Sequence, residues 1–501
     1  MVQGTASSVG KSVIATALCR IFRQDGLRVA PFKAQNMALN SFVTRDGGEI
    51  GRAQAAQAEA AGVEATVEMN PILLKPETDA RSQVIVRGRP LTTSSARHYY
   101  DLKPQLWSVV EESFASLAAA YDLIVIEGAG SPAEVNLRES DIVNMRVAKM
   151  AQAPVLLVGD VDKGGVFASL VGTLELIEPE ERELVRGFVI NKFRGDISLL
   201  RPGLDFLEAK TGKPVVGVVP YYRDIVVAQE DSVYLDHRRE DRTSNALLDV
   251  AVVRFPHISN FDDFDPLEQE PAVRVRYVSD AGLLGRPDLV ILPGTKSTMA
   301  DLRFLRHTGL AQGVVDLARS GVPIIGICGG FQMLGKAISD PYGVESAEKW
   351  MAGLGLLPNT TVFEPVKTTR QVAARVACDI GLLHGIFGVT LSAYEIHVGA
   401  TDAGGAPPVF RVSLEHPKGQ QHQDGAISED GLVLGTYLHG LFDGDEFRRR
   451  LLAGLLARKG AASEVIGSVF SKEQQYDKLA DLVRGSVNMA LLRELCELGS
   501  D

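Results

Sequence analysis

Short apolar runs alternate with longer segments of helical periodicity in the first half of the chain. These runs lie at 123–126, 155–158, 188–190 and 215–219. Strands that are apolar along their whole length and are separated by helices are typical of a parallel sheet covered on both faces. The pattern predicts a doubly wound α/β domain over residues 1–225.

A second series of apolar strands follows a polar stretch. Residues 226–248 are rich in charge and are predicted to be an exposed linker. Beyond it we expect a second α/β domain over 249–450, in which short segments with Gly, Thr and Pro turns from about 353 to 437 predict antiparallel strands. The pattern over 451–501 predicts a C-terminal helical segment.

Composition narrows the class of protein. A chain of 501 residues is too long for one hydrophobic core, and its four cysteines have no paired spacing that would predict disulfides or a zinc site. A net charge of −11 argues against a nucleic-acid partner. No apolar stretch is long enough to span a membrane, and the N-terminus leads directly into a glycine-rich motif without a signal peptide. We therefore expect a cytoplasmic protein without a membrane partner, whose oligomeric state the sequence does not predict.

One basic stretch departs from the acidic balance. It contains Lys75, Arg81, Arg87, Arg89 and Arg97. Two interpretations stay open at this point, a solvated pair of strands and a surface that holds a multiply anionic substrate.

Cys328 is the candidate nucleophile. It stands in Gly326-Ile327-Cys328-Gly329-Gly330, directly after the apolar strand 322–325. A strand that ends at a nucleophile flanked by small residues and continues into a helix lifts the side chain above the sheet. The alternative interpretation is a buried cysteine in a glycine-rich turn.

His439, in GTYLHGLFD, is the best placed of nine histidines to serve as general base for Cys328. Class I glutamine amidotransferases, which this half of the chain resembles, carry a glutamate two positions after this histidine, where this chain has Leu441. The departure suggests a Cys-His dyad or an orienting acid from elsewhere, for which Glu395 is one possibility. Gly294 or its neighbour in PGTKST is expected to donate an oxyanion-hole N–H.

GTASSVGKS at residues 4–12 predicts a phosphate-binding loop. Backbone N–H groups between two glycines face phosphate oxygens, a lysine neutralises charge, and a serine hydroxyl reaches a magnesium ion. Five residues rather than four separate the glycines, which is similar to dethiobiotin synthetase and its relatives. The alternative is a chance loop at the start of a helix. The predicted ATP-binding residues in this loop are Gly4, Thr5, Gly10, Lys11 and Ser12.

Polar residues after three strands complete the predicted nucleotide site. Glu127 follows strand 123–126 and is expected to join Ser12 as a magnesium ligand, with a helix-capping carboxylate as the alternative. Asp160 and Asp162 could hold metal, water or substrate. Asn191 stands where relatives contact the nucleotide base.

With these residues, the chain resembles the cobyric acid synthase family over essentially its full length. The matching segments are GTASSVGKS, PFKAQNMALNS, GEIGRAQAAQAEAAGVE, MNPILLKP, EGAGSPAEVNL, GDVDKGGVFA, ISNFDDFDPL, LPGTKST, YEIHVG and YLHGLFD, together with the Cys328 turn. The resemblance implies a dethiobiotin synthetase-like ATP-binding domain followed by a class I glutamine amidotransferase-like domain.

The resemblance also implies an activity. The family amidates the b, d, e and g carboxylates of adenosylcobyrinic acid a,c-diamide, a cobalt-containing corrinoid, with glutamine as nitrogen donor and with ATP and Mg²⁺. Lys33 and Lys75 are candidates to neutralise the acyl phosphate or the corrinoid carboxylates. The runner-up is cobyrinic acid a,c-diamide synthase, which shares both domain types but lacks KAQNMALNS. An alternative of another class is a non-catalytic switch NTPase, which has an extra lysine where this chain has Thr5 and Ala6.

Overall fold

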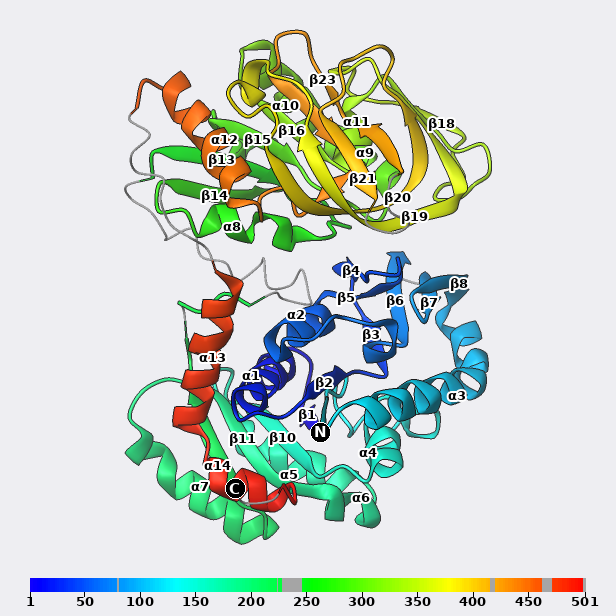
Figure 1. Ribbon diagram of the computed structural model, residues 1–501. Coiled ribbons are helices and arrows are strands. Elements are labelled where there is room, and N and C mark those ends of the chain that lie inside the picture. Colours follow the sequence, from blue (N-terminus) through cyan, green and yellow to red (C-terminus); the bar gives the residue numbers. More distant parts are fainter. Residues whose placement is uncertain (79–80, 223, 228–245, 415–419, 462–470, 499–501) are drawn as a thin grey trace. The chain divides into compact units, whose positions relative to one another are not determined.

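The computed structural model describes residues 1–78, 81–222, 224–227, 246–414, 420–461 and 471–498 (Figure 1). The chain forms two compact units. The first contains Met1–Ala38, Glu49–Ala228 and Ser471–Asp501, and the second contains Leu39–Gly48 and Gln229–Phe470. Most of the predicted linker lies outside the described residues.

The first unit is built on a parallel sheet. Its strands β1 (Val2–Gly4), β10 (Val155–Asp160), β11 (Val185–Phe193) and β12 (Val215–Pro220) pair in that order. The pair β2 (Val29–Phe32) and β9 (Leu123–Ile126) is also parallel, and a bridge between Val2 and Glu127 connects it to β1. The predicted doubly wound parallel sheet is therefore confirmed.

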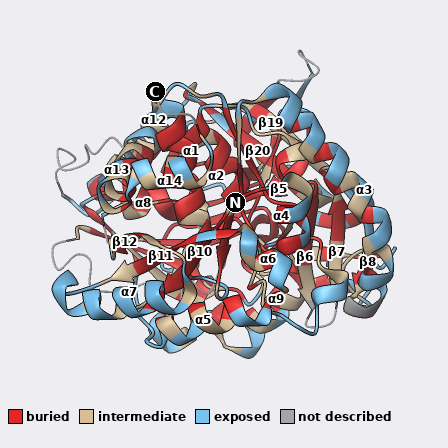
Figure 2. Ribbon diagram, turned by 90° about the horizontal axis from the view of Figure 1, so that it is seen from below, coloured by how far each residue is buried: buried red, intermediate tan, exposed pale blue. Residues whose placement is uncertain are grey.

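Helices surround this sheet. They are α1 (Lys11–Gln24), α2 (Arg52–Ala61), α3 (Ala96–Ala120), α4 (Met145–Ala151), α5 (Val166–Leu176), α6 (Pro179–Leu184) and α7 (Ile197–Thr211). The outer faces of α5 and α7 are exposed to solvent (Figure 2), whereas α2 is buried at every position except Glu59. α1 begins directly after Gly10, whose φ of 104° is unfavourable for residues with a Cβ. The phosphate-loop glycine thus also sets the start of the first helix.

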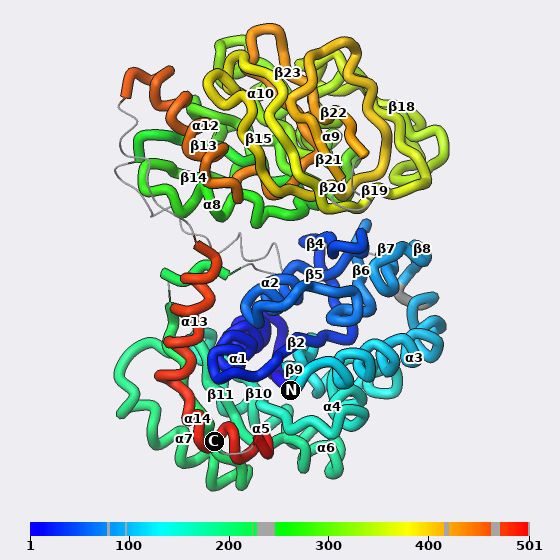
Figure 3. Tube along the Cα trace, viewed as in Figure 1, coloured from blue at the N-terminus to red at the C-terminus, as the bar shows by residue number. Residues whose placement is uncertain are grey.

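The C-terminal helices α13 (Lys472–Ser486) and α14 (Met489–Leu495) belong to the first unit. Figure 3 shows α13 beside α1. Arg20 of α1 forms ion pairs with Glu473 at 2.7 Å and with Asp477 at 2.8 Å, and Tyr476 packs into the same apolar cluster as Leu18. Within the predicted segment 451–501, the described residues include α13, α14 and the end of α12 (Asp445–Arg458), and α12 lies in the second unit.

A smaller sheet in the first unit carries most of the basic stretch. Its strands are β3 (Gln35–Met37), β6 (Ile72–Thr78), β7 (Arg81–Val86) and β8 (Arg89–Ser95), the last three antiparallel. Lys75 is buried in an ion pair with Glu49 of β5 (Glu49–Gly51) at 2.7 Å, and Arg87 pairs with Glu112. The side chain of Arg97 lies outside the described residues.

The second unit contains a six-stranded, mainly parallel sheet. Its order is β14 (Val273–Val278), β13 (Leu248–Val253), β15 (Leu289–Leu292), β16 (Ile324–Ile327), β24 (Val433–Thr436) and antiparallel β23 (Ala426–Ile427). The strand residues of β15 and β16 are buried throughout, as expected for strands covered on both faces. Helices α9 (Thr298–His307) and α10 (Leu310–Arg319) connect β15 to β16, and α11 (Gly329–Leu334) follows β16.

A second sheet confirms the antiparallel strands predicted for 353–437. The long strands β19 (Thr360–Val376) and β20 (Thr390–Asp402) form an antiparallel pair, and β20 pairs with β25 (Leu438–His439). The remaining strands of this sheet are β17 (Ala337–Ser339), β18 (Trp350–Ala352), β21 (Phe410–Leu414) and β22 (Gln421–Asp424).

Residues 39–48, which include β4 (Ser41–Val43), interrupt the sequence of the first unit and pack with the second. Val43 is buried in a cluster with Tyr394 and Ile396 of β20. Gln371 Nε2 donates to Val43 O, and Thr369 Oγ1 donates to Gly47 O, both at 2.8 Å. A short piece of the KAQNMALNS segment is therefore part of the second unit.

Candidate active sites

Cys328 occupies a strained turn between β16 and α11. Its φ of 52° and ψ of −109° are rare for a residue with a side chain, and such strain persists only where the surrounding structure enforces it. The Cys328 N–H donates to Thr436 O at 2.8 Å, which holds the turn to β24. A Cβ on Gly330 would lie 2.0 Å from Leu292 O, so the turn requires glycine there. The predicted nucleophile elbow geometry is present.

His439 is fully buried on β25 and is held by a carboxylate that the sequence did not single out. Asp263 Oδ2 lies 2.7 Å from His439 Nδ1, and Asp263 Oδ1 accepts a hydrogen bond from Gly440 N at 2.8 Å. Both oxygens of the carboxylate are thus engaged, and the proton on Nδ1 leaves Nε2 as the atom that faces the reaction.

The other ring nitrogen of His439 is available for proton transfer. Among the described residues, Nε2 has no partner at hydrogen-bond geometry, and the Cys328 thiol instead lies 3.5 Å from Ile396 O. Burial alone would lower the pKa of His439, but the Asp263 carboxylate and the adjacent Cys328 outweigh burial and raise that pKa to about 10. The imidazole therefore carries a proton at neutral pH, next to the thiol, and an imidazolium stabilises a neighbouring thiolate.

Glu395, the suggested orienting acid, has other partners. It pairs with Arg370, and its Oε1 lies 3.0 Å from His422 Nε2. Asp263 is the acid on His439, and the dyad interpretation is replaced by a Cys-His-Asp arrangement. In the sequence, Asp263 lies in the acidic motif ISNFDDFDPL, which is the signal that could have indicated it.

The loop that contains Gly294 lies close to His439 and to Gly329, the residue after Cys328. A Cβ on Gly294 would be 2.7 Å from His439 Cε1, and one on Gly329 would be 3.3 Å from Thr295 N. Glycine at 294 therefore allows the loop to approach the imidazole. The oxyanion-hole role of Gly294 stays a prediction.

The phosphate loop of the first unit is preformed. Lys11 Nζ donates to Ala6 O at 2.9 Å and to Gly130 O at 3.0 Å, across the mouth of the loop. Asn191 Nδ2 donates to Val9 O at 2.8 Å, and a Cβ on Gly10 would lie 2.0 Å from that nitrogen. Asn191 is buried and braces the loop backbone, so this contact differs from the predicted one to the base.

Glu127 and Ser12, the two predicted magnesium ligands, lie side by side. Ser12 Oγ donates to Glu127 Oε1 at 2.8 Å, and Lys33 Nζ lies 3.0 Å from the same oxygen. Burial would raise the pKa of Glu127, but Lys33 and a hydrogen bond from Gln57 outweigh burial and lower it. The carboxylate is therefore ionised, as a magnesium ligand must be.

The acids after β10 pair with cations. Lys192 Nζ lies 2.7 Å from Asp160 Oδ2, and Arg194 lies 3.2 Å from Asp162. Across the described part of the chain, no group of three or more His, Cys, Asp or Glu side chains could hold a metal ion.

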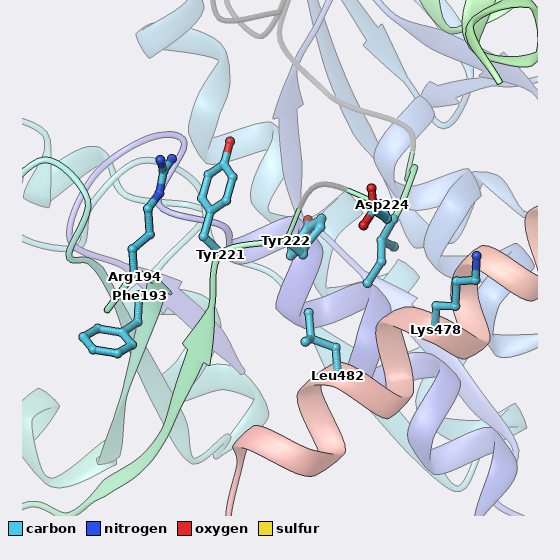
Figure 4. Close-up of a pocket in the computed structure, with 8 residues that line it drawn as sticks. Phe193, Arg194, Tyr221, Tyr222, Asp224, Lys478 and Leu482 are labelled. Carbon is cyan, nitrogen blue, oxygen red and sulfur yellow. The ribbon is translucent and has the colours of Figure 1, made fainter. Parts of the chain in front are cut away.

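A pocket of about 710 Å³ opens beside the end of β11. Its lining includes Phe193 at the end of β11, Arg194 directly after it, Tyr221 and Tyr222 after β12, and Leu482 of α13 (Figure 4). The Arg194 guanidinium lies 3.7 Å from the centre of the Tyr221 ring. The first lining residue, Phe193, is two positions after Asn191 in the sequence. The aromatic rings and the guanidinium group give the pocket flat surfaces.

Two protein-family models match successive parts of the chain. A CobQ/CobB/MinD/ParA nucleotide binding domain matches residues 1–233, and a CobB/CobQ-like glutamine amidotransferase domain matches residues 249–447. Fold and site thus define a glutamine amidotransferase joined to a nucleotide-binding domain. None of the helices in the described ranges is long and apolar enough to cross a bilayer.

Full-length relatives narrow the class further. The chain is 53% identical to a cobyric acid synthase from Dehalococcoides mccartyi over 98% of this chain and 97% of that protein. It is 55% identical to one from Sorangium cellulosum and 51% identical to one from Moorella thermoacetica, with 98% and 99% of those proteins covered. The chain belongs to the cobyric acid synthase family.

Proposed function

We propose that this chain catalyses the ATP-dependent amidation of the b, d, e and g carboxylates of adenosylcobyrinic acid a,c-diamide, with ammonia released from glutamine. The observation that carries the proposal is the combination of a strained Cys328 beside a buried His439 with a preformed phosphate loop in the other unit. The full-length relatives favour this substrate over that of the runner-up.

In the glutaminase reaction, Cys328 Sγ attacks the side-chain amide carbon of glutamine. His439 gives its proton to the departing nitrogen. Ammonia is released, and the glutamyl group stays bound to Cys328 as a thioester. His439 then takes a proton from water, which attacks the thioester and releases glutamate. Asp263 keeps the Nδ1 proton in place and stabilises the imidazolium through both halves of the reaction.

In the synthetase reaction, a substrate carboxylate attacks the γ-phosphorus of ATP and forms an acyl phosphate and ADP. Ammonia then displaces phosphate and forms the amide. Lys11 is positioned to neutralise phosphate charge. Ser12 and Glu127 would hold Mg²⁺, which when bound neutralises phosphate oxygens, and Lys33 would then shift from Glu127 toward the anionic reactants. The nucleobase is assigned to the pocket beside Tyr221, where its ring can stack.

One experiment tests the assignment of substrate and nitrogen source together. The protein is incubated with the diamide, Mg-ATP and either glutamine or ammonium, and the amidations are counted by mass spectrometry. Wild type is expected to complete four amidations with either nitrogen source, whereas Cys328→Ser uses only ammonium. Absence of amidation by wild type, or glutamine use by Cys328→Ser, would contradict the proposal.

A further inference from the structure

The segment Asn40–Val43 is bound to the loop that carries Asp263. Ser41 N donates to Asn260 Oδ1 and Phe261 N donates to Asn40 Oδ1, both at 3.3 Å. Each asparagine side chain thus accepts a hydrogen bond from the backbone N–H of the residue that follows the other asparagine. This contact lies within the second unit, although the sequence on both sides of residues 39–48 belongs to the first.

Asn260 connects this segment to both supports of His439. Its carbonyl accepts from Asp263 N at 3.1 Å at the start of the turn that carries the Asp263 carboxylate. Its side-chain Nδ2 donates to the Tyr394 hydroxyl at 2.9 Å. Asn260 adopts a φ of 54°, a left-handed conformation that asparagine tolerates better than most residues. One amide therefore organises the acid and the aromatic side chain together.

Tyr394 covers one face of the catalytic imidazole. Its ring is stacked on His439 with centroids 5.2 Å apart and an interplanar angle of 18°. Val43 packs with Tyr394 and Ile396 in one buried cluster, and the Ile396 carbonyl is the group that Cys328 Sγ contacts. Val43 therefore packs against Tyr394, which stacks on the imidazole, and against Ile396 of β20, whose carbonyl contacts Cys328.

We propose that residues 40–43 are a positioning element of the glutaminase site, which holds the His439 imidazole in line with Cys328 through Asn260 and Tyr394. The inference rests on the proposed glutaminase role of Cys328 and His439. Its physical basis is that a fully buried imidazole is held by Asp263 at one atom and by Tyr394 over one face, and loosening either permits the ring to tilt. A misplacement of about 1 Å at a reacting group costs about a hundredfold in rate.

Two variants test the element in the full-length protein. Val43→Ala removes packing against Tyr394 and Ile396, and Val314→Ala on α10 is the control with the same loss of methyl groups from a buried site. Asn260→Gly keeps the left-handed backbone and removes both amide contacts. Gln152→Gly, at a φ of 48° in the first unit, controls for added backbone freedom. Glutamate release, ammonia-dependent amidation and thermal unfolding are measured for each, with Cys328→Ser in the same assays.

We expect Val43→Ala and Asn260→Gly to lower the glutaminase kcat about tenfold to a hundredfold, with the KM for glutamine changed less than about threefold. Ammonia-dependent amidation and both controls should stay at wild-type levels. A glutaminase kcat equal to that of the controls, or an equal loss of ammonia-dependent amidation, overturns the inference. If Asn260→Gly does not fold, Val43→Ala decides. Retained glutaminase in Cys328→Ser would instead overturn the proposed function itself.

Discussion

Replacement of Asp263 by asparagine should strongly lower glutamine hydrolysis without affecting the use of ammonia. In the native site one carboxylate oxygen binds His439 and the other accepts from Gly440 N. An asparagine has one acceptor oxygen for these two positions. If that oxygen stays on Gly440 N, the amide NH₂ faces Nδ1 and drives the imidazole proton to Nε2, which then cannot accept a proton. The opposite orientation sets the NH₂ against the Gly440 N–H.

Asp263 contributes most to raising the pKa of His439, ahead of Cys328, so its replacement weakens the preference for the imidazolium. An Asp-to-Asn change in a comparable triad costs about 10⁴-fold in kcat, roughly 5 kcal/mol of barrier. We therefore expect Asp263→Asn to lower the glutaminase kcat by about 10³- to 10⁴-fold.

Steady-state glutamate release measures the loss, and ammonia-dependent amidation shows that the other site is intact. Glu395→Gln is the matched control, because Glu395 is an equally buried acid that binds Arg370 and His422 rather than His439. We expect that control to lose less than about tenfold, or roughly 1.4 kcal/mol. An equal loss in the two variants, or a loss of less than tenfold for Asp263→Asn, would show that Asp263 does not orient His439.

The pH dependence of stability offers an independent readout of the same ion pair. A histidine whose folded pKa is raised stabilises the fold fully below its unfolded pKa near 6.5, and this contribution is lost as the pH rises through about 10. Without the carboxylate the folded pKa falls. The difference in Tm between wild type and Asp263→Asn should therefore be largest near pH 6 and should shrink toward pH 10, as followed by thermal unfolding.

Three further predictions concern other parts of the chain. Lys11→Ala should lower amidation about 10²-fold or more with either nitrogen source, because phosphate charge is no longer neutralised, and an unchanged rate at saturating ATP would contradict this. Tyr221→Ala should raise the KM for ATP about tenfold with kcat retained if the base stacks in the pocket of Figure 4, whereas an unchanged KM would place the base elsewhere. Arg448→Ala removes the fully buried guanidinium that lies 2.8 Å from Glu270 and donates to Phe442 O, and should destabilise the second unit by about 3–5 kcal/mol. Arg450→Ala, at an exposed pair with Glu446, should cost less than about 0.5 kcal/mol in the same denaturant titration.

Local pattern was sufficient to predict the strands, the Cys328 turn and the phosphate loop. Each depends on residues close together in sequence: apolar runs define buried strands, and the glycines next to Cys328 permit a turn at a φ that its own side chain disfavours. The adjacency of Ser12 and Glu127 could also be predicted, since the carboxyl ends of parallel strands meet at one edge of a sheet.

The acid that orients His439 becomes apparent only in the folded chain. Asp262, Asp263 and Asp265 are equivalent in the sequence, and just one of them is placed by the turn after Asn260 so that its carboxylate reaches the imidazole of β25. The contact between α13 and α1 and the packing of Val43 with Tyr394 could not be predicted from the sequence either. Contacts between residues hundreds of positions apart depend on how whole elements pack, and hydrophobic periodicity specifies that a face is buried but not which partner buries it.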